Sequence, residues 1–438
     1  MNLKPRLSIP VWLRVACWVR DAWLILGVAV AIWLGLELVY RAEGALRREA
    51  ARLLGHATRP RSPYADSSWY AEFLTEEEAS FRLRWVSYVY WRRRPLRGKY
   101  INVDSLGHRR TVQAAPVRTG GRRIFFFGGS TMFGLFQRDA WTIPSLVAAR
   151  FAAHGLDNVD ITNFGETGYV YMQEVLELLL QLRSGVRPDV VVFYDGINDV
   201  AAAVQNGLPG LPQNEANRAR EFEIGRTLFT RSTDATAEAC VLATLARLGA
   251  GRSQLLDRLA RLVHPARRPP LNVDSLAGAL ATTYVATGNL VEALSRRYGF
   301  DVIYIWQPCL FTTRKRLTPY ERAVASEIAP LEFHRLQQQV HEAVRQPIQL
   351  RMQRVALGRF LNLSGLFDAE TTSVYMDVGG HITEAANGLI VDSIVARLMP
   401  LLSKRVRKRQ GSPTPPQAAC CLPAHVPEIA PTAAQHER

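Results

Sequence analysis

The sequence predicts an α/β fold in which a parallel β-sheet carries helices on both faces, preceded by one membrane-spanning helix. Two observations predict it. From residue 123 onward, short apolar runs typical of buried strands alternate with segments whose apolar residues recur at helical spacing. Ahead of this region, residues 22–36 are uncharged and almost wholly apolar. The alternation indicates three α/β/α layers, because the helices between parallel strands cover both sheet faces.

Each expected strand is a mostly apolar run that ends at turn residues. We expect strands over residues 123–127, 159–164, 189–194, 301–306 and, shorter, 374–376. We expect helices over residues 142–154, 171–182, 331–345 and 388–402, where apolar residues share one helical face.

The N-terminal apolar segment continues past Glu37 to Tyr40, so residues 22–40 are long enough to cross a hydrocarbon core of about 30 Å. Tryptophans flank it, as at membrane interfaces. Basic residues are nearly balanced on its two sides, so its N-terminal position alone favours residues 1–21 in the cytoplasm and the large domain outside. A cleavable signal peptide is disfavoured, because no small-residue cleavage site follows promptly. A buried helix of a soluble domain remains the alternative, which Glu37 favours.

Composition shifts divide the rest of the chain. Residues 41–100 are predicted to form a juxtamembrane helix and a basic, aromatic lead-in, and residues 101–402 the α/β domain. Within that domain, residues 201–290 break the strand–helix rhythm and predict an inserted, helical lid or cap. Residues 403–438 begin with a basic run, become rich in Pro, Ala and Gln, and predict a disordered tail.

Bulk composition narrows the class of protein. The 438 residues are 48% hydrophobic and 21% charged, which excludes wholesale disorder. The net charge of +15 is spread along the chain without a nucleic-acid-binding motif, so we expect no nucleic-acid partner and consider anionic lipid or an acidic polysaccharide instead. The five cysteines lack metal-ligand spacing, and their odd number argues against a complete disulfide framework; a Cys240–Cys309 bridge stays open. No metal or organic cofactor is implied.

Four blocks of residues, in chain order, predict a serine ester-cleaving site. Ser130 follows a Gly-Gly turn after the first strand, where its hydroxyl can reach a reacting carbonyl. Gly168 and Asn198 follow the next two strands, so all three lie at the carboxyl edge of the sheet. Gly168 N–H, Asn198 and the Ser130 N–H are candidate oxyanion donors. His381 is the candidate base and Asp377 its orienting carboxylate.

Each block alone has an ordinary explanation. Proteins without such a site commonly contain a Gly-Gly-Ser turn, a lone glycine, an asparagine helix cap or a surface Asp/His pair. The order and placement of the four blocks favour the catalytic interpretation. Asp195 and Asp199 lie near the third block and are interpreted as structural.

The chain resembles the SGNH (GDSL-like) hydrolase superfamily, and especially its membrane-anchored bacterial members. The matching blocks are Gly129-Ser130, Gly168, Gly196-x-Asn198 and Asp377…His381. The resemblance implies a flavodoxin-like α/β/α fold, with Ser130 as nucleophile, Gly168 and Asn198 as oxyanion donors, and His381 as base. Two departures stand out: the acid of the usual Gly-Asp-Ser is absent, and three residues instead of two separate Asp377 from His381.

The leading functional hypothesis is a membrane-anchored serine ester hydrolase that acts on an acylated carbohydrate or lipid through an acyl-enzyme. A second hypothesis is an O-acyltransferase that modifies an exported polysaccharide, in which a sugar hydroxyl replaces water and the 201–290 insert excludes water. A third is a non-catalytic, membrane-tethered binding protein that keeps the fold, supported only by the extra residue before His381. Nothing in the sequence separates the first two.

Overall fold

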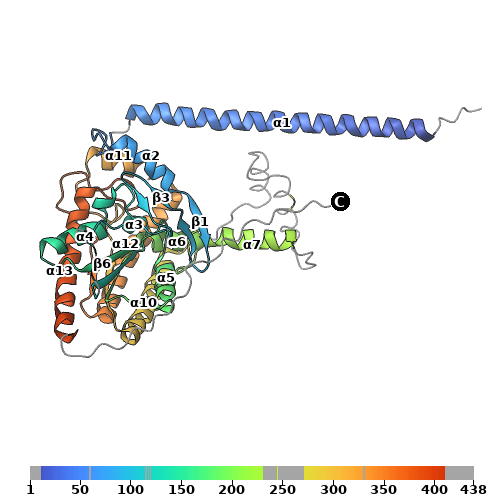
Figure 1. Cartoon of the computed structure of the whole chain (residues 1–438). Coiled ribbons are helices and arrows are strands. Elements are labelled where there is room, and N and C mark those ends of the chain that lie inside the picture. Colours follow the sequence, from blue (N-terminus) through green and yellow to red (C-terminus); the bar gives the residue numbers. More distant parts are fainter. Residues whose placement is uncertain are drawn as a thin grey trace, which may run out of the picture. The chain divides into compact units, whose positions relative to one another are not determined.

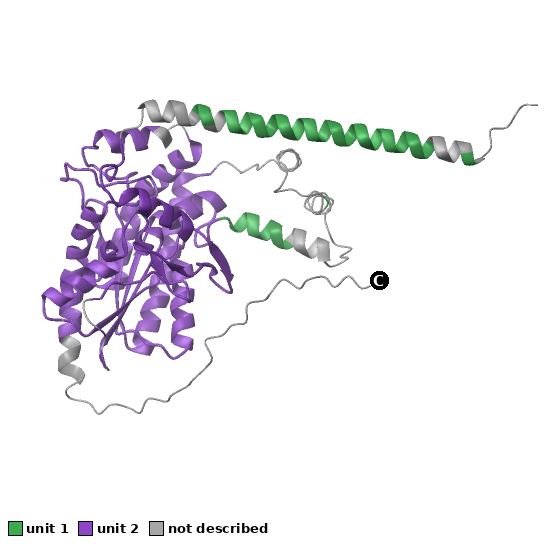
Figure 2. Cartoon of the chain, turned by 45° about the horizontal axis from the view of Figure 1, so that its top comes forward, with its two compact units in different colours: residues 1–60, 214–270 green, residues 61–213, 271–438 purple. Residues whose placement is uncertain are grey.

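The computed structural model describes residues 11–58, 61–113, 116, 118, 120–229, 244, 271–328 and 331–409. The chain divides into two compact units (Figure 2). Unit 1 comprises residues 1–60 and 214–270, and unit 2 comprises residues 61–213 and 271–438.

Unit 1 contains helices α1 (Val11–Thr58) and α7 (Glu215–Phe229). Within α1, Trp18–Leu46 form a 29-residue stretch that is long and apolar enough to cross a membrane. Apolar side chains along it, Ile25 and Leu38 among them, are exposed. Glu37 is ion-paired with Arg41 one turn later, with 2.7 Å between Arg41 Nε and Glu37 Oε1. This pairing lowers the cost of an acidic group in an apolar surrounding.

Unit 2 is built on a five-stranded parallel sheet, visible at the centre of the α/β unit in Figure 1. Its order is β6-β5-β7-β8-β9, the flavodoxin-like order 2-1-3-4-5. The strands are β5 (Arg122–Gly128), β6 (Val159–Asn163), β7 (Val190–Asp195), β8 (Asp301–Trp306) and β9 (Phe360–Asn362). The predicted fold class is therefore confirmed.

Alternate residues of each strand enter different cores. Phe126, Val192 and Ile303 pack into one core and Phe125, Val191 and Val302 into the other. Helices α4 (Ile143–Ala153), α11 (Pro319–Ile328) and α13 (Glu384–Arg409) cover the first face. Helices α5 (Tyr171–Arg183), α6 (Ile197–Asn206), α10 (Val273–Tyr298) and α12 (Glu332–Ala356) cover the second. These are the three expected layers.

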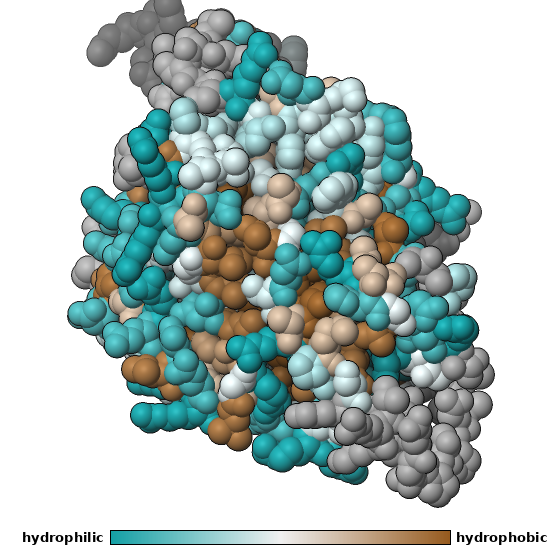
Figure 3. Space-filling model, turned by 90° about the vertical axis from the view of Figure 1, so that its left-hand side faces the viewer, coloured by the Kyte–Doolittle hydropathy of each residue, from teal (hydrophilic) through white to brown (hydrophobic). Residues whose placement is uncertain are grey.

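Helix α13 is a core helix, although Glu384–Ser403 is also long and apolar enough to cross a membrane. Its residues Ile390, Ile394 and Leu398 are fully buried in the first core. Figure 3 shows the face at the left of Figure 1, where α4 and α13 lie; apolar residues gather in its middle and hydrophilic residues surround them.

Two segment predictions differ from the structure. The predicted tail begins at residue 403, but α13 continues to Arg409; the rest of the tail lies outside the described residues. The predicted insert over residues 201–290 includes most of α6 and the first part of α10, and both bury apolar side chains in the second core. Only residues 214–270 fall outside unit 2. Most of that segment also lies outside the described residues.

The expected strand over residues 374–376 does not form a strand. Glu321 of α11 accepts the N–H groups of Val374 (2.8 Å) and Tyr375 (3.1 Å), so they are unavailable for a ladder. A single bridge joins Tyr375 to Ile382 instead. Strand β9, in contrast, was not predicted, because three residues are too few to show a period.

From residue 61 onward the lead-in is part of unit 2. It forms α2 (Tyr70–Ser80) and two antiparallel pairs, β1 (Leu83–Val86) with β2 (Tyr90–Arg93) and β3 (Leu96–Arg97) with β4 (Asn102–Val103). Arg92 and Arg93 are buried and paired with Glu177 (2.8 Å) and Glu166 (3.3 Å). These two charges are therefore internal, and they do not attract a polyanion.

Candidate active site

The candidate nucleophile lies where the first sheet strand turns into a helix. Strand β5 ends at Gly128, Gly129 is extended, and the short helix α3 (Ser130–Phe133) begins at Ser130. The Ser130 N–H is at a helix start and has no intrahelical carbonyl to bond, so it is free to face a developing oxyanion. Ser130 is only 5% exposed.

His381 and Asp377 complete a hydrogen-bonded row with Ser130. His381 Nε2 lies 2.7 Å from Ser130 Oγ, and His381 Nδ1 lies 2.7 Å from Asp377 Oδ2. With a proton on Nδ1, the ring donates to the carboxylate and accepts from the hydroxyl. The structure thus brings together the three side chains that the sequence singled out, with base and orienter at hydrogen-bond distance.

Two glycines accommodate the additional residue between Asp377 and His381. Gly380 has φ +79°, in the left-handed region that other residues rarely adopt. A Cβ at Gly379 would lie 2.9 Å from His381 Cε1, so any side chain there would press on the imidazole. The loop bulges at these glycines and still returns the His381 N–H to Asp377 Oδ1 at 3.4 Å. The longer spacing therefore leaves the Asp–His contact intact.

Asn198 lies beside the nucleophile turn. It is in the first turn of α6, after Gly196, whose φ of +133° only glycine adopts readily. A Cβ placed on Gly129 would overlap Asn198 Nδ2 and lie 3.2 Å from its Cγ. The side-chain NH₂ of Asn198 thus occupies the space that a side chain at position 129 would need.

Gln213 orients Asn198, and the sequence did not point to it. Its Nε2 donates to Asn198 Oδ1 at 3.2 Å, which turns the Asn198 NH₂ toward Gly129. Its Oε1 would lie 3.4 Å from a Cβ on Gly168. Gln213 is therefore adjacent to two of the three candidate oxyanion donors, Asn198 and Gly168. A glutamine in a Pro-rich loop carries no motif, so only the folded structure identifies it.

The turn that carries Gly168 is fixed by buried polar contacts. Gly168 has φ +75°, and the carbonyl of the next residue, Tyr169, would lie 3.7 Å from a Cβ on Gly129. Upstream, Asn163 Nδ2 donates to Met132 O at 2.9 Å, which ties the turn to α3. Arg93 pairs with Glu166 and also bonds to Thr167, so the lead-in holds this turn against the site.

A group of buried carboxyls lies behind the site. Burial raises the pKa of Glu174 and Asp195 well above their usual range; the charge of Asp195 adds to the rise at Glu174, and the charge of Asp199 adds to the rise at Asp195. Burial likewise raises the pKa of Asp199 to about 7, although it accepts the Tyr171 N–H at 3.1 Å. Both oxygens of Glu174 and Oδ2 of Asp195 are buried without a hydrogen-bond partner among the described residues, which favours a protonated carboxyl at this place. Asp195 and Asp199 are thus internal, as interpreted from the sequence.

Among the described residues, no group of three or more His, Cys, Asp or Glu side chains is arranged to hold a metal ion. Cys309 is buried and unbridged, and Cys240 lies outside the described residues.

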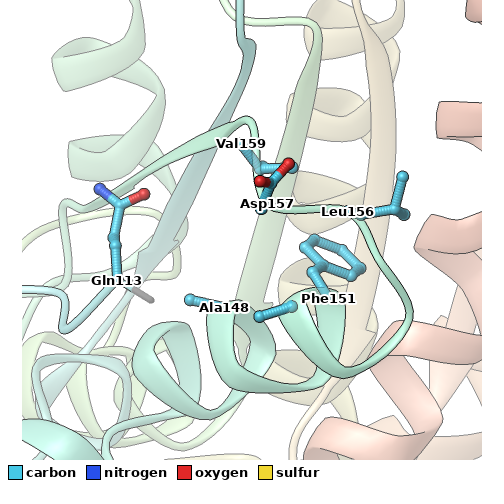
Figure 4. A pocket seen from close by; sticks show the side chains of 7 residues that line it. Gln113, Ala148, Phe151, Leu156, Asp157 and Val159 are labelled. Carbon is cyan, nitrogen blue, oxygen red and sulfur yellow. The ribbon is translucent and has the colours of Figure 1, made fainter. Parts of the chain in front are cut away.

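A small cavity lies at the opposite edge of the sheet (Figure 4). It lies between the end of α4, at Phe151, and the start of β6, at Val159. Its volume of about 10 Å³ has room for about one water molecule. Because the candidate site lies at the carboxyl ends of the strands, this cavity takes no part in it.

No protein-family model and no curated protein matches the chain. Several solved structures are similar at 12–14% identity. They include the acetyl xylan esterase AlAXEase (13% identity, 63% of this chain and 98% of that one, TM-score 0.34) and TesA (13%, 64% and 99%, TM-score 0.33). A member of the lipolytic G-D-S-L family from Veillonella parvula DSM 2008 is also similar (13%, 62% and 94%, TM-score 0.32). Identities and TM-scores this low carry no argument about the site. The fold assignment therefore depends on the order of the strands in the sheet, and the site assignment depends on the distances among Ser130, His381 and Asp377.

Proposed function

We propose that the chain is a serine ester hydrolase that works through an acyl-enzyme. The observation that carries the proposal is the row Asp377–His381–Ser130, with 2.7 Å at each step. A serine hydroxyl needs a base within about 2.6–3.2 Å, and the base needs an orienting partner. The row supplies both in a position at the carboxyl edge of the sheet.

The chemistry follows from these contacts. His381 Nε2 takes the hydroxyl proton as Ser130 Oγ attacks the ester carbonyl carbon. The Ser130 N–H, the Gly168 N–H and the Asn198 NH₂ stabilise the negative oxygen that forms. Collapse breaks the bond to the alcohol, which leaves with the proton from His381. Water then gives a proton to His381, attacks the acyl carbon, and releases the acid while Ser130 recovers its proton.

We propose an acylated carbohydrate or lipid as substrate and a membrane anchor in α1, with the N-terminus in the cytoplasm and unit 2 outside. The apolar length of Trp18–Leu46 supports the anchor.

Extraction of membranes with alkaline carbonate tests the anchor. The full chain should stay in the membrane pellet, and a chain lacking residues 1–46 should be released. Protease protection of unit 2 in spheroplasts would contradict the orientation.

A fluorophosphonate probe tests the nucleophile. We expect the wild type to be labelled and Ser130→Ala and His381→Ala to lose labelling. Ser403→Ala and His154→Ala, exposed residues of α13 and of the α4 C-terminus, are matched controls that should keep it. A folded wild-type protein that the probe does not label would contradict the hydrolase proposal. The non-catalytic alternative depended on the extra residue before His381, and the intact Asp377 contact removes that support.

The acyltransferase alternative shares the acyl-enzyme and differs only in the acceptor. Product analysis with an acyl donor, with and without a glycan acceptor, separates the two: free acid alone indicates hydrolysis, and acylated glycan indicates transfer.

A further inference from the structure

A hollow of about 260 Å³, lined by both polar and apolar side chains, lies on the surface of unit 2. Its lining includes Lys99, Tyr100, Asn102, Arg110, Arg138 and Trp141. Sites for drug-sized ligands occupy about 300–1,000 Å³, so this hollow suits a small ligand or one segment of a longer one.

One cation of the hollow is available to a ligand. Lys99 is paired with Glu72 at 2.7 Å, and Arg138 donates to both oxygens of Glu384 at 3.0 and 2.7 Å. Arg110 is exposed, and among the described residues it has no ion pair. A guanidinium can bind a carboxylate through two parallel hydrogen bonds, so the hollow suits an anionic group at Arg110.

The hollow also offers an aromatic surface. Trp141 is 40% exposed, and the Arg138 guanidinium lies 5.7 Å from its ring centroid. Tyr100 and Asn102 border the hollow as well, but their donors are engaged: the Tyr100 hydroxyl donates to Glu72, and the Asn102 amide donates to Gly98 O and Asp139. A sugar ring has apolar C–H faces and a polar edge, and an exposed indole bordered by polar groups matches both. A lipid phosphate would use the cation but not the indole face.

The hollow is joined to the segment that follows His381. Gln137 Nε2 donates to Ile382 O at 3.2 Å, and Asn387 Nδ2 donates to Trp141 O at 2.9 Å. The two hydrogen bonds from Arg138 to Glu384 lie between them in the sequence. A chain bound in the hollow therefore rests on residues fixed to the loop of the candidate base.

We propose that this hollow binds a segment of an acidic oligosaccharide, with a carboxylate on Arg110 and a sugar ring on Trp141. That the bound chain is the substrate or acceptor rests on the proposed function; binding itself does not.

Calorimetric titration of the full chain in detergent with oligogalacturonate, and with a neutral xylo-oligosaccharide of equal length, tests the inference. We expect the acidic chain to bind more tightly, and binding to weaken as salt rises from 0.05 to about 0.5 M. Arg110→Gln should raise Kd about fivefold, the effect of a solvent-exposed ion pair of about 1 kcal/mol. Trp141→Ala should raise Kd for both oligosaccharides. Arg335→Gln, which removes one exposed charge from α12 on the other sheet face, is the matched control and should leave Kd unchanged.

Equal loss in Arg110→Gln and Arg335→Gln would overturn the site, because it would show attraction to net charge alone. Arg110-dependent binding of phosphatidylglycerol in mixed detergent micelles by the full chain, without oligogalacturonate binding, would also overturn it. Hydrolysis of p-nitrophenyl acetate without oligogalacturonate binding would refute this inference and leave the hydrolase intact. Binding of oligogalacturonate by a chain that neither hydrolyses p-nitrophenyl acetate nor reacts with the fluorophosphonate probe would support this inference and refute the hydrolase proposal.

Discussion

Gly129→Ala tests whether Asn198 is an oxyanion donor. The new Cβ would overlap Asn198 Nδ2, so that nitrogen must move by about 1 Å or more to reach an ordinary contact. The overlapping atom is the end of a flexible side chain, so the fold should tolerate the change. Displacing or removing one oxyanion donor costs about 10²–10³ in kcat, or about 2.7–4 kcal/mol.

The assay is hydrolysis of p-nitrophenyl acetate, with the melting temperature measured on the same samples. We expect kcat to fall about 10²-fold or more in both Gly129→Ala and Asn198→Ala, with little change in melting temperature. The double variant should be no worse than Asn198→Ala, because truncation removes the atom that the new Cβ would displace. Full additivity, or a Gly129→Ala variant within about threefold of wild type, would refute the reasoning.

Three further predictions follow from the site. Gln213→Leu removes the donor to Asn198 Oδ1, so kcat should fall about tenfold with KM nearly unchanged, and Gln213→Glu should not restore it because it lacks the NH₂. Asp377→Asn should lower kcat about 10³–10⁴-fold by favouring the wrong His381 tautomer; an effect below tenfold would remove Asp377 from the row. Burial raises the pKa of Glu174 in the folded state, so the folded chain retains a proton that the unfolded chain releases above pH 4.5. Stability should therefore fall with rising pH by up to about 1.4 kcal/mol per unit for that proton, and Glu174→Gln, compared by chemical unfolding at pH 5 and 8, should flatten this slope. An unchanged slope would show that Glu174 is ionised in the fold.

The sequence was most informative where strands are buried on both faces. Strands β5, β7 and β8 are continuous apolar runs because helices cover both sides of them, and such runs stand out in the sequence. Ser130, Gly168 and Asn198 could be assigned to one sheet edge because parallel strands end at the same edge.

The rest depends on contacts that no local pattern encodes. Arg93 is part of a basic run, yet it is buried against Glu166, 73 residues away. Gln213 reaches Asn198 only because its loop folds back beside α6. Glu321 accepts the N–H groups of Val374 and Tyr375, which a strand over residues 374–376 would need for pairing. In each case the decisive partner lies outside the local sequence pattern.

The Ser130–His381 hydrogen bond has a consequence for folding, since it joins residues 251 positions apart. Contacts of such separation carry a large loop-closure entropy and form only after nearer contacts have offset that entropy. We therefore expect the Ser130 turn and His381 to remain apart until late in folding. In a refolding experiment, esterase activity should return with the last kinetic phase, after far-ultraviolet circular dichroism has recovered. A partly folded chain then holds an unactivated serine, so it cannot cleave esters before the structure is complete.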